Sequence, residues 1–113
     1  MEVRTLHEGE ISVIEINGEV DMYSSPDVRT IIIELTKSKK PTIMIDLRNV
    51  CYMDSSGLAT LVEGLQLTGK YDGAFKLINL RDEVLEVFEL TRLDHIFEIY
   101  DSKELALQSL QTK

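Results

Sequence analysis

The chain has 113 residues, of which 43% are hydrophobic and 28% charged, as expected for one globular domain. Its 20 acidic and 12 basic side chains give a formal net charge of −8, which argues against nucleic-acid binding because phosphates attract clustered lysine and arginine. No apolar run reaches the roughly 18–20 residues of a membrane span, and the N-terminus lacks the apolar core of a signal peptide, so we expect a cytoplasmic protein without membrane insertion.

The chain begins with two predicted strands, over residues 3–6 and 11–17. In the second strand Ile14 and Ile16 fall on one face, because side chains alternate along a strand. The turn-like residues 7–10 separate the two strands. An antiparallel hairpin is therefore the simplest arrangement of this segment.

A helix is predicted after the segment Ser24-Ser25-Pro26-Asp27. A serine can cap a helix here, proline suits the first turn, and an acidic residue favours the positive end of the helix. Lysines 37, 39 and 40 mark its end. The apolar residues behind the cap follow the spacing of a one-sided helix: Val28, Ile31, Ile32 and Leu35.

The strongest strand signal covers residues 42–47, where three consecutive apolar residues are typical of a strand covered on both faces. A second amphipathic helix is predicted from about Gly57 to Thr68, and Gly69 is a plausible end for it. Gly64 lies within this helix at a cost of about 1 kcal/mol. We interpret it as a place where the helix packs close to another backbone.

The remaining elements alternate between strands and helices. The pattern predicts a strand over 75–78, a helix over 82–90, a strand over 96–100 and a helix over 102–110. The resulting order is β-β-α-β-α-β-α-β-α. Strands joined through helices pair in parallel, so we predict a single α/β domain with about four helices and a mixed, mostly parallel sheet that begins with an antiparallel hairpin.

Two loops are predicted to share one edge of this sheet, where α/β proteins usually bind ligands. The first, Glu19 to Ser24, follows a strand and precedes a helix, and so does the second, Asp54-Ser55-Ser56-Gly57. The simplest reading of the second loop is that Ser55 or Ser56 caps the helix. On the same reading, Asp21 and Asp54 are caps or solvated charges.

No catalytic or metal-binding arrangement stands out. The residues around Ser56 lack the glycines of a nucleophile elbow, and neither His7 nor His95 lies in a recognisable motif, so we expect no enzymatic activity. One cysteine and two histidines exclude an internal disulfide and the usual zinc cage, and no cofactor motif is present. Cys51 is expected to be a small core residue.

Three segments resemble the STAS domain, and specifically the free-standing anti-sigma factor antagonists of bacteria. They are residues 43–58 (IMIDLRNVCYMDSSGL), residues 18–21 (GEVD) and residues 90–97 (LTRLDHIF), in the order of the family's motifs. The resemblance runs over nearly the whole chain and implies one STAS domain over residues 1–113. Arg92 departs from the pattern, because glycine is common at its position, and this leaves the local turn open.

The resemblance implies a partner switch. In that family the unmodified antagonist binds an anti-sigma factor that is also a serine kinase, which releases the sigma factor for transcription. The kinase phosphorylates the second serine of the Asp-Ser-Ser-Gly motif, which is Ser56 here, and a PP2C-type phosphatase removes the phosphate. Asp54 is expected to orient the acceptor and Gly57 to allow the backbone turn. The expected contact surface comprises Asp21, Met22, Tyr23, Ser24, Asp54, Ser55, Ser56 and Gly57.

Two alternatives stay open at this point. The first is a STAS module that regulates or scaffolds a transporter or a stress-signalling complex. The second is a small hydrolase that uses Ser56 as its nucleophile. Recovery of a transporter as the only partner favours the first, and labelling of Ser56 by a serine-reactive phosphonate favours the second.

Overall fold

The computed structural model describes residues 1–111. The predicted order of elements is confirmed, and a short 3-10 turn is added before the last strand. The elements are β1 (Glu2–Glu8), β2 (Ile11–Val20), α1 (Ser25–Lys37), β3 (Thr42–Met53), α2 (Ser55–Gly69), β4 (Ala74–Ile78), α3 (Asp82–Leu90), the 3-10 turn η1 (Leu93–His95), β5 (Glu98–Tyr100) and α4 (Lys103–Gln111).

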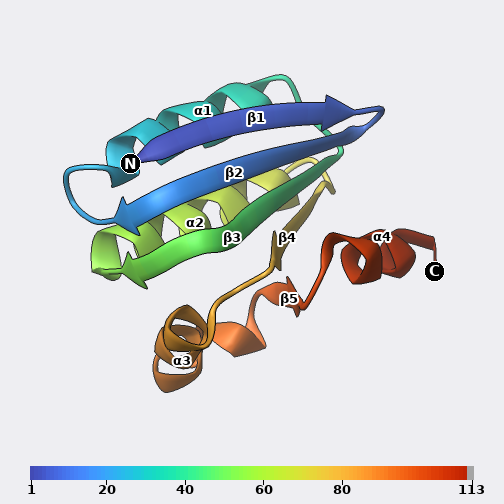
Figure 1. Cartoon of the computed structure of the whole chain (residues 1–113). Helices are drawn as coiled ribbons and strands as arrows, with labels where there is room; N and C mark the ends of the chain where they lie inside the picture. Colours follow the sequence, from blue (N-terminus) through green and yellow to red (C-terminus); the bar gives the residue numbers. More distant parts are fainter. Residues whose placement is uncertain (112–113) are drawn as a thin grey trace.

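The five strands form one mixed sheet in the order β1-β2-β3-β4-β5 (Figure 1). Strand β1 pairs antiparallel with β2 through the predicted hairpin, and every later pair is parallel. Each parallel pair is connected through a helix, because a tight turn cannot join the ends of two parallel strands. The carboxyl ends of β2 and β3 therefore lie at the same edge of the sheet.

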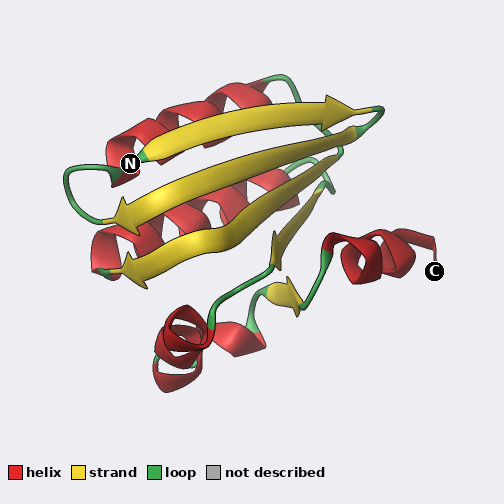
Figure 2. Cartoon of the chain, viewed as in Figure 1, coloured by secondary structure: helices red, strands yellow, loops and turns green. Residues whose placement is uncertain are grey.

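Helices cover both faces of the sheet, but unequally (Figure 2). Helices α1, α2 and α3 pack on one face and form the main core, whereas α4 packs on the other face against a smaller cluster built around Val13, Met44 and Ile78. Each fully buried apolar side chain contributes roughly 1.5–3 kcal/mol to folding. The main core includes Ile14, Ile16, Ile32, Ile43, Ile45, Leu47, Leu61, Phe75, Leu77 and Phe88.

Strand β3 is longer than predicted and continues to Met53. Its pairing with β4 ends at Asp46, so the remaining part of β3 lies beyond its neighbour and exposes side chains to solvent. Cys51 lies in this overhanging part and is exposed. The prediction that it is a core residue is therefore wrong.

Gly64 permits a close contact of α2, but the contacted group is a side chain and not a backbone. A Cβ atom at this position would lie 2.6 Å from the ring of Phe75 and 3.2 Å from Ile32. The glycine thus lets α2 approach the aromatic ring beneath it, which is fully buried. The prediction that Gly64 packs against another backbone is therefore wrong, whereas the need for a small residue at this position is confirmed.

Arg92 has a left-handed backbone with φ of 62°. This conformation costs an L-residue about 1–2 kcal/mol, whereas glycine adopts it freely but loses more entropy on folding. We therefore expect Arg92→Gly to raise the free energy of unfolding by about 0.5–1 kcal/mol in urea denaturation. Arg92→Ala removes the same charge but keeps Cβ, so it is expected to give no gain. Equal unfolding midpoints for the two variants would contradict this explanation.

Candidate functional site

The loops after β2 and β3 begin side by side, as predicted. Glu19 pairs with Tyr52 and Val20 with Met53 at the ends of the two parallel strands. The Asp54 N–H then donates to the Val20 carbonyl at 3.1 Å, which extends the contact by one residue. The two loops therefore form one continuous surface at the carboxyl edge of the sheet.

Asp54 is the N-cap of α2. Its Oδ1 accepts hydrogen bonds from the N–H groups of Ser56 at 2.9 Å and Gly57 at 3.3 Å. The reading of Asp54 as a cap is confirmed, whereas the expectation that Ser55 or Ser56 caps the helix is wrong, because the Asp54 carboxylate already satisfies these donors. Asp54 thus fixes the backbone of Ser56 directly.

Ser56 lies in the first turn of α2 and is half-buried, next to the exposed Ser55. Within residues 1–111 no hydrogen bond engages the hydroxyl of either serine. The Ser56 hydroxyl is therefore held at the positive end of a helix without an intramolecular partner. That geometry leaves it available to another polypeptide.

Gly57 is buried where α2 meets the ends of the two strands. A Cβ atom there would lie 2.6 Å from Met53 Cγ, 2.9 Å from Val20 Cγ1 and 3.1 Å from the Val20 carbonyl oxygen. The residue is already helical, so its role is this close approach and not the turn that the sequence suggested. A larger residue at this position must push the start of α2 away from β2.

The side chain of Asp21 stabilises the loop between β2 and α1 through hydrogen bonds. Its Oδ1 accepts from the N–H groups of Tyr23 at 2.9 Å and Ser24 at 3.0 Å, and these bonds, that to Ser24 first, hold the pKa of Asp21 below its ordinary value. The Ser24 hydroxyl in turn donates to the Glu19 carbonyl at 2.8 Å. The loop is therefore ordered by its own hydrogen bonds and presents its remaining side chains outward.

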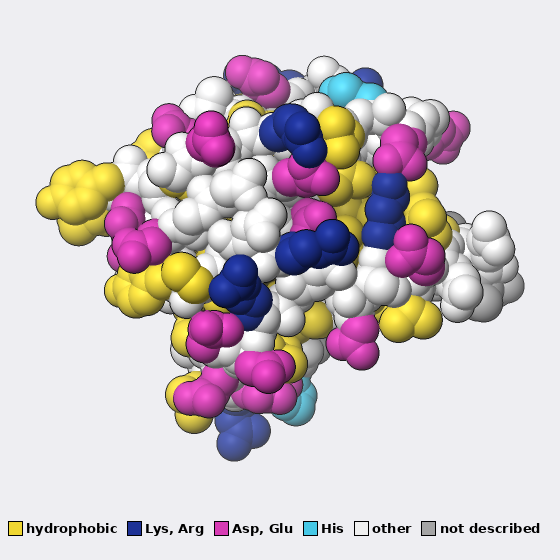
Figure 3. Space-filling model, in the orientation of Figure 1, with side chains coloured by type: hydrophobic (Ala, Val, Ile, Leu, Met, Phe, Trp, Pro, Cys, Tyr) yellow, Lys and Arg dark blue, Asp and Glu magenta, His cyan; other side chains and the backbone are white. Residues whose placement is uncertain are grey.

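Large apolar side chains project from this edge. Tyr23 is 85% exposed, Met22 64% and Tyr52 50%. Figure 3 shows hydrophobic side chains at its left end with acidic side chains beside them, where Figure 1 places the ends of β2 and β3. Exposed aromatic residues and methionine are enriched at protein interfaces. We refer to Met22, Tyr23 and Tyr52 as the apolar edge.

A cavity of about 480 Å³ adjoins the apolar edge. Three carboxylates contribute to it, which makes it suited to a basic side chain rather than an acidic one. Its lining residues are Met1, Glu19, Asp21, Tyr23, Ser24 and Asp27. In the described part of the chain, no three or more His, Cys, Asp or Glu residues are grouped so as to hold a metal ion.

The predicted site residues are thus brought together, and Tyr52 and Cys51 join them from the overhanging part of β3. The two histidines lie outside this surface. His7 contacts Ser12, and His95 is exposed beside Asp94. The expected contact surface did not include Tyr52, because a sequence pattern does not distinguish an exposed aromatic side chain from a packed one. The arrangement offers a binding surface with an acceptor hydroxyl.

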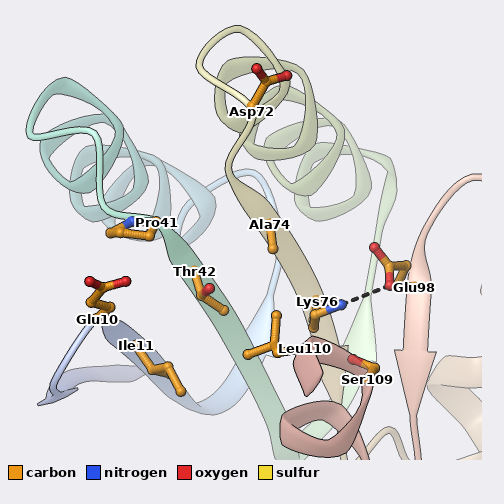
Figure 4. A pocket seen from close by; sticks show the side chains of 10 residues that line it. All are labelled: Glu10, Ile11, Pro41, Thr42, Asp72, Ala74, Lys76, Glu98, Ser109 and Leu110. Atoms are coloured by element: carbon orange, nitrogen blue, oxygen red, sulfur yellow. Dashed lines mark hydrogen bonds and ion pairs between the residues drawn. The ribbon is translucent and has the colours of Figure 1, made fainter. Parts of the chain in front are cut away.

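A separate cavity of about 570 Å³ lies at the opposite edge, near the starts of β3 and β4 (Figure 4). Its charged centre is buried Lys76, whose Nζ donates to Glu98 Oε1 at 2.7 Å and lies 5.2 Å from the centre of the Tyr100 ring. The ion pair satisfies the buried ammonium group, which would otherwise be costly. We assign this ion pair a structural role in the sheet and no role in the function of the surface around Ser56.

The Lys76–Glu98 pair predicts an observable titration. The hydrogen bond from Lys76 holds the pKa of Glu98 below its ordinary value. A lowered folded-state pKa stabilises the fold above the ordinary glutamate pKa, and this stabilisation is lost as pH falls through the folded-state pKa. We expect Lys76→Met to raise the pKa of Glu98, as followed by NMR of its side-chain carboxyl carbon. An unchanged pKa would show that the pair does not control this carboxyl group.

The protein family of this chain is established by a match over most of its sequence. A profile of the STAS domain matches residues 2–106, which includes both loops of the site and all five strands. The chain belongs to the STAS domain family. No helix within residues 1–111 of this STAS protein is long and apolar enough to span a bilayer.

Relatives of this STAS chain carry the names of regulators. It is 34% identical over 95 residues, 84% of this chain and 86% of the relative, to the anti-sigma-B factor antagonist of Bacillus subtilis (strain 168). An anti-sigma factor antagonist from Mycobacterium paratuberculosis has a structure with a TM-score of 0.88 at 26% identity, covering 97% of this chain and 93% of that one. The names of both relatives describe antagonists, in agreement with the predicted absence of enzymatic activity.

A third similarity concerns the fold alone. The phosphorylated form of the Bacillus cell fate determinant SpoIIAA matches with a TM-score of 0.76 at 21% identity, over 96% of this chain and 99% of that chain. At this identity the similarity shows that the STAS fold is shared. It also shows that a protein of this fold exists in a phosphorylated state.

Proposed function

We propose that this chain is an anti-sigma factor antagonist whose binding is controlled by phosphorylation of Ser56. The observation that carries the proposal is the Ser56 hydroxyl, held in the first turn of α2 beside the apolar edge with no hydrogen-bond partner among residues 1–111. The curated relative at 34% identity bears the same functional name. We further propose that residues 1–113 form one STAS domain and that the protein is cytoplasmic.

The proposed partner in the unmodified state is an anti-sigma factor that is also a serine kinase. The apolar edge supplies the buried centre of the contact, and the carboxylates of the adjoining cavity favour basic residues on the partner. Binding releases the sigma factor. The kinase transfers a phosphoryl group to Ser56, and a PP2C-type phosphatase later removes it.

We assign a different role to each group of residues in this surface. Asp54 fixes the acceptor backbone, and Gly57 keeps α2 against β2 so that both loops stay in one surface. Asp21 and Ser24 order the neighbouring loop. Met22, Tyr23 and exposed Ser55 provide contact area around the hydroxyl.

A phosphate on Ser56 changes the charge of the surface without a need to refold the domain. It adds about −1.5 to −2 charges, which the positive end of α2 tolerates or favours by about 0.3–1 kcal/mol at an exposed position. The nearby carboxylates of Asp54 and Asp21 add to the negative potential. A docked partner must then desolvate or pair a dianion, which opposes binding strongly. The names of the curated relatives favour this function over a transporter or scaffold subunit.

The test is to incubate the chain with its cognate anti-sigma factor kinase and ATP and to map the phosphate by mass spectrometry. We expect one phosphate on Ser56 and none on the Ser56→Ala variant. Ser55→Ala is the matched control, because it removes the adjacent hydroxyl and leaves the proposed acceptor unchanged. Phosphate on Ser55, or on any residue outside the loop, would overturn the assignment of the acceptor.

A further inference from the structure

A second surface lies between the carboxyl-terminal parts of α1 and α2. It is a groove of about 360 Å³ with an apolar floor formed by Ile33 of α1, Leu67 of α2 and Tyr71 just after α2. All three side chains are only half-buried, although α1 and α2 bury other residues against the sheet. The Tyr71 hydroxyl donates to the Lys40 carbonyl at 2.8 Å, which fixes one end of the groove.

Lysines flank this groove on both sides. Lys37 and Lys39 come from the end of α1 and the turn after it, and Lys70 comes from the end of α2. None of them forms an ion pair with another residue in the range 1–111. The one carboxylate in the lining, Glu63, is already engaged by Arg29 through two hydrogen bonds of 2.6 and 3.0 Å.

The positive charge of the groove contrasts with the rest of the chain. The net charge is −8, yet three of the seven lysines in the sequence, Lys37, Lys39 and Lys70, line this groove. Cations at the C-terminal end of a helix interact favourably with the helix dipole, which explains why lysines are tolerated at these positions. It does not explain why they border an exposed apolar strip. Such a strip bordered by unpaired cations is complementary to an apolar surface bordered by carboxylates.

The groove is remote from Ser56. Leu67 and Lys70 follow Ser56 by 11 and 14 residues along α2, which corresponds to about 16 and 21 Å at 1.5 Å per residue. A partner at the groove therefore need not contact the apolar edge. Its binding is expected to be independent of the charge at residue 56.

We propose that the α1–α2 groove is a docking site for an acidic amphipathic helix of a second partner protein. A helix places an apolar stripe between two polar flanks, which matches the apolar floor between lysines of α1 and α2. Three separate ammonium groups suit several carboxylates better than the single head group of a small anion. The proposal goes beyond the antagonist function and does not depend on it.

The probe is a synthetic peptide of roughly 15 residues, the length at which an isolated helix begins to be stable, with leucines along one stripe and glutamates on both flanks. Binding is followed by ¹⁵N NMR of the full chain. We expect saturable shifts at residues 33, 36–39 and 67–71 and none at 54–57, and a lower affinity at higher salt. A control peptide with serines in place of the leucines is expected not to bind.

The matched variants are Lys70→Glu and Arg48→Glu, which make the same charge change on exposed side chains, inside and outside the groove respectively. We expect Lys70→Glu to weaken peptide binding at least about tenfold and Arg48→Glu no more than about twofold. Ser56→Asp is expected to leave peptide affinity unchanged. Absence of binding up to about 1 mM, equal losses in both charge variants, or shifts located at another surface would overturn the docking site without bearing on Ser56.

Discussion

Ser56→Asp is expected to weaken binding of the anti-sigma factor kinase at least about a hundredfold, which corresponds to roughly 3 kcal/mol. The reason is that a carboxylate replaces a neutral hydroxyl beside Asp54, in a surface that the partner must desolvate. Ser56→Ala lacks the hydroxyl but adds no charge, so its affinity is expected to stay within about threefold of the unmodified chain. Isothermal titration calorimetry with the purified kinase measures both affinities.

The stability of the two variants separates a binding effect from a folding effect. An acidic residue in the first turn of α2 is favoured by the helix dipole, so Ser56→Asp is expected to unfold at the same or slightly higher urea concentration than the unmodified chain. A large loss of stability in Ser56→Asp would attribute the weaker binding to unfolding. Equal kinase affinities for the Asp and Ala variants would contradict the electrostatic switch itself.

Gly57→Ala is expected to lower the free energy of unfolding by about 1–3 kcal/mol. The added methyl group would overlap Met53 and Val20, which are buried and therefore cannot move aside freely. The higher helix propensity of alanine offsets at most about 1 kcal/mol of this cost. Urea denaturation followed by circular dichroism measures the difference.

Gly69→Ala is the matched control for this prediction. It makes the same substitution at the other end of α2, where, within residues 1–111, no atom outside the helix backbone and the two adjacent residues lies within 4 Å of the added Cβ. We expect it to leave stability unchanged or to raise it by up to about 1 kcal/mol. If Gly57→Ala were as stable as Gly69→Ala, the close approach between α2 and β2 would not limit the residue at position 57.

The order of elements could be predicted from the sequence, because apolar periodicity changes from strand to helix at each junction. The end of β3 could not. Arg48 and Asn49 are polar and resemble a loop, yet they lie in a strand whose neighbour β4 has already ended. Exposure of Cys51 has the same cause. The missing information was the relative length of two adjacent strands, which only the assembled sheet determines.

The site shows a similar division. The position of the Asp-Ser-Ser-Gly segment at a strand–helix junction was predictable from turn chemistry and from the resemblance to STAS antagonists. The choice of capping residue was left open, since Asp54, Ser55 and Ser56 are all suitable caps in consecutive positions and the structure uses Asp54. The role of Gly57 also depended on a tertiary contact, with Val20. Local sequence thus located the site, and packing between β2 and α2 determined its geometry.

The most direct test of the central claim compares the kinase affinity of the chain phosphorylated at Ser56 with that of the unmodified chain, by calorimetry at one ionic strength. The proposed switch predicts tight binding of the unmodified chain and at least about a hundredfold weaker binding of the phosphorylated one. Equal affinities, or tighter binding after phosphorylation, would contradict it.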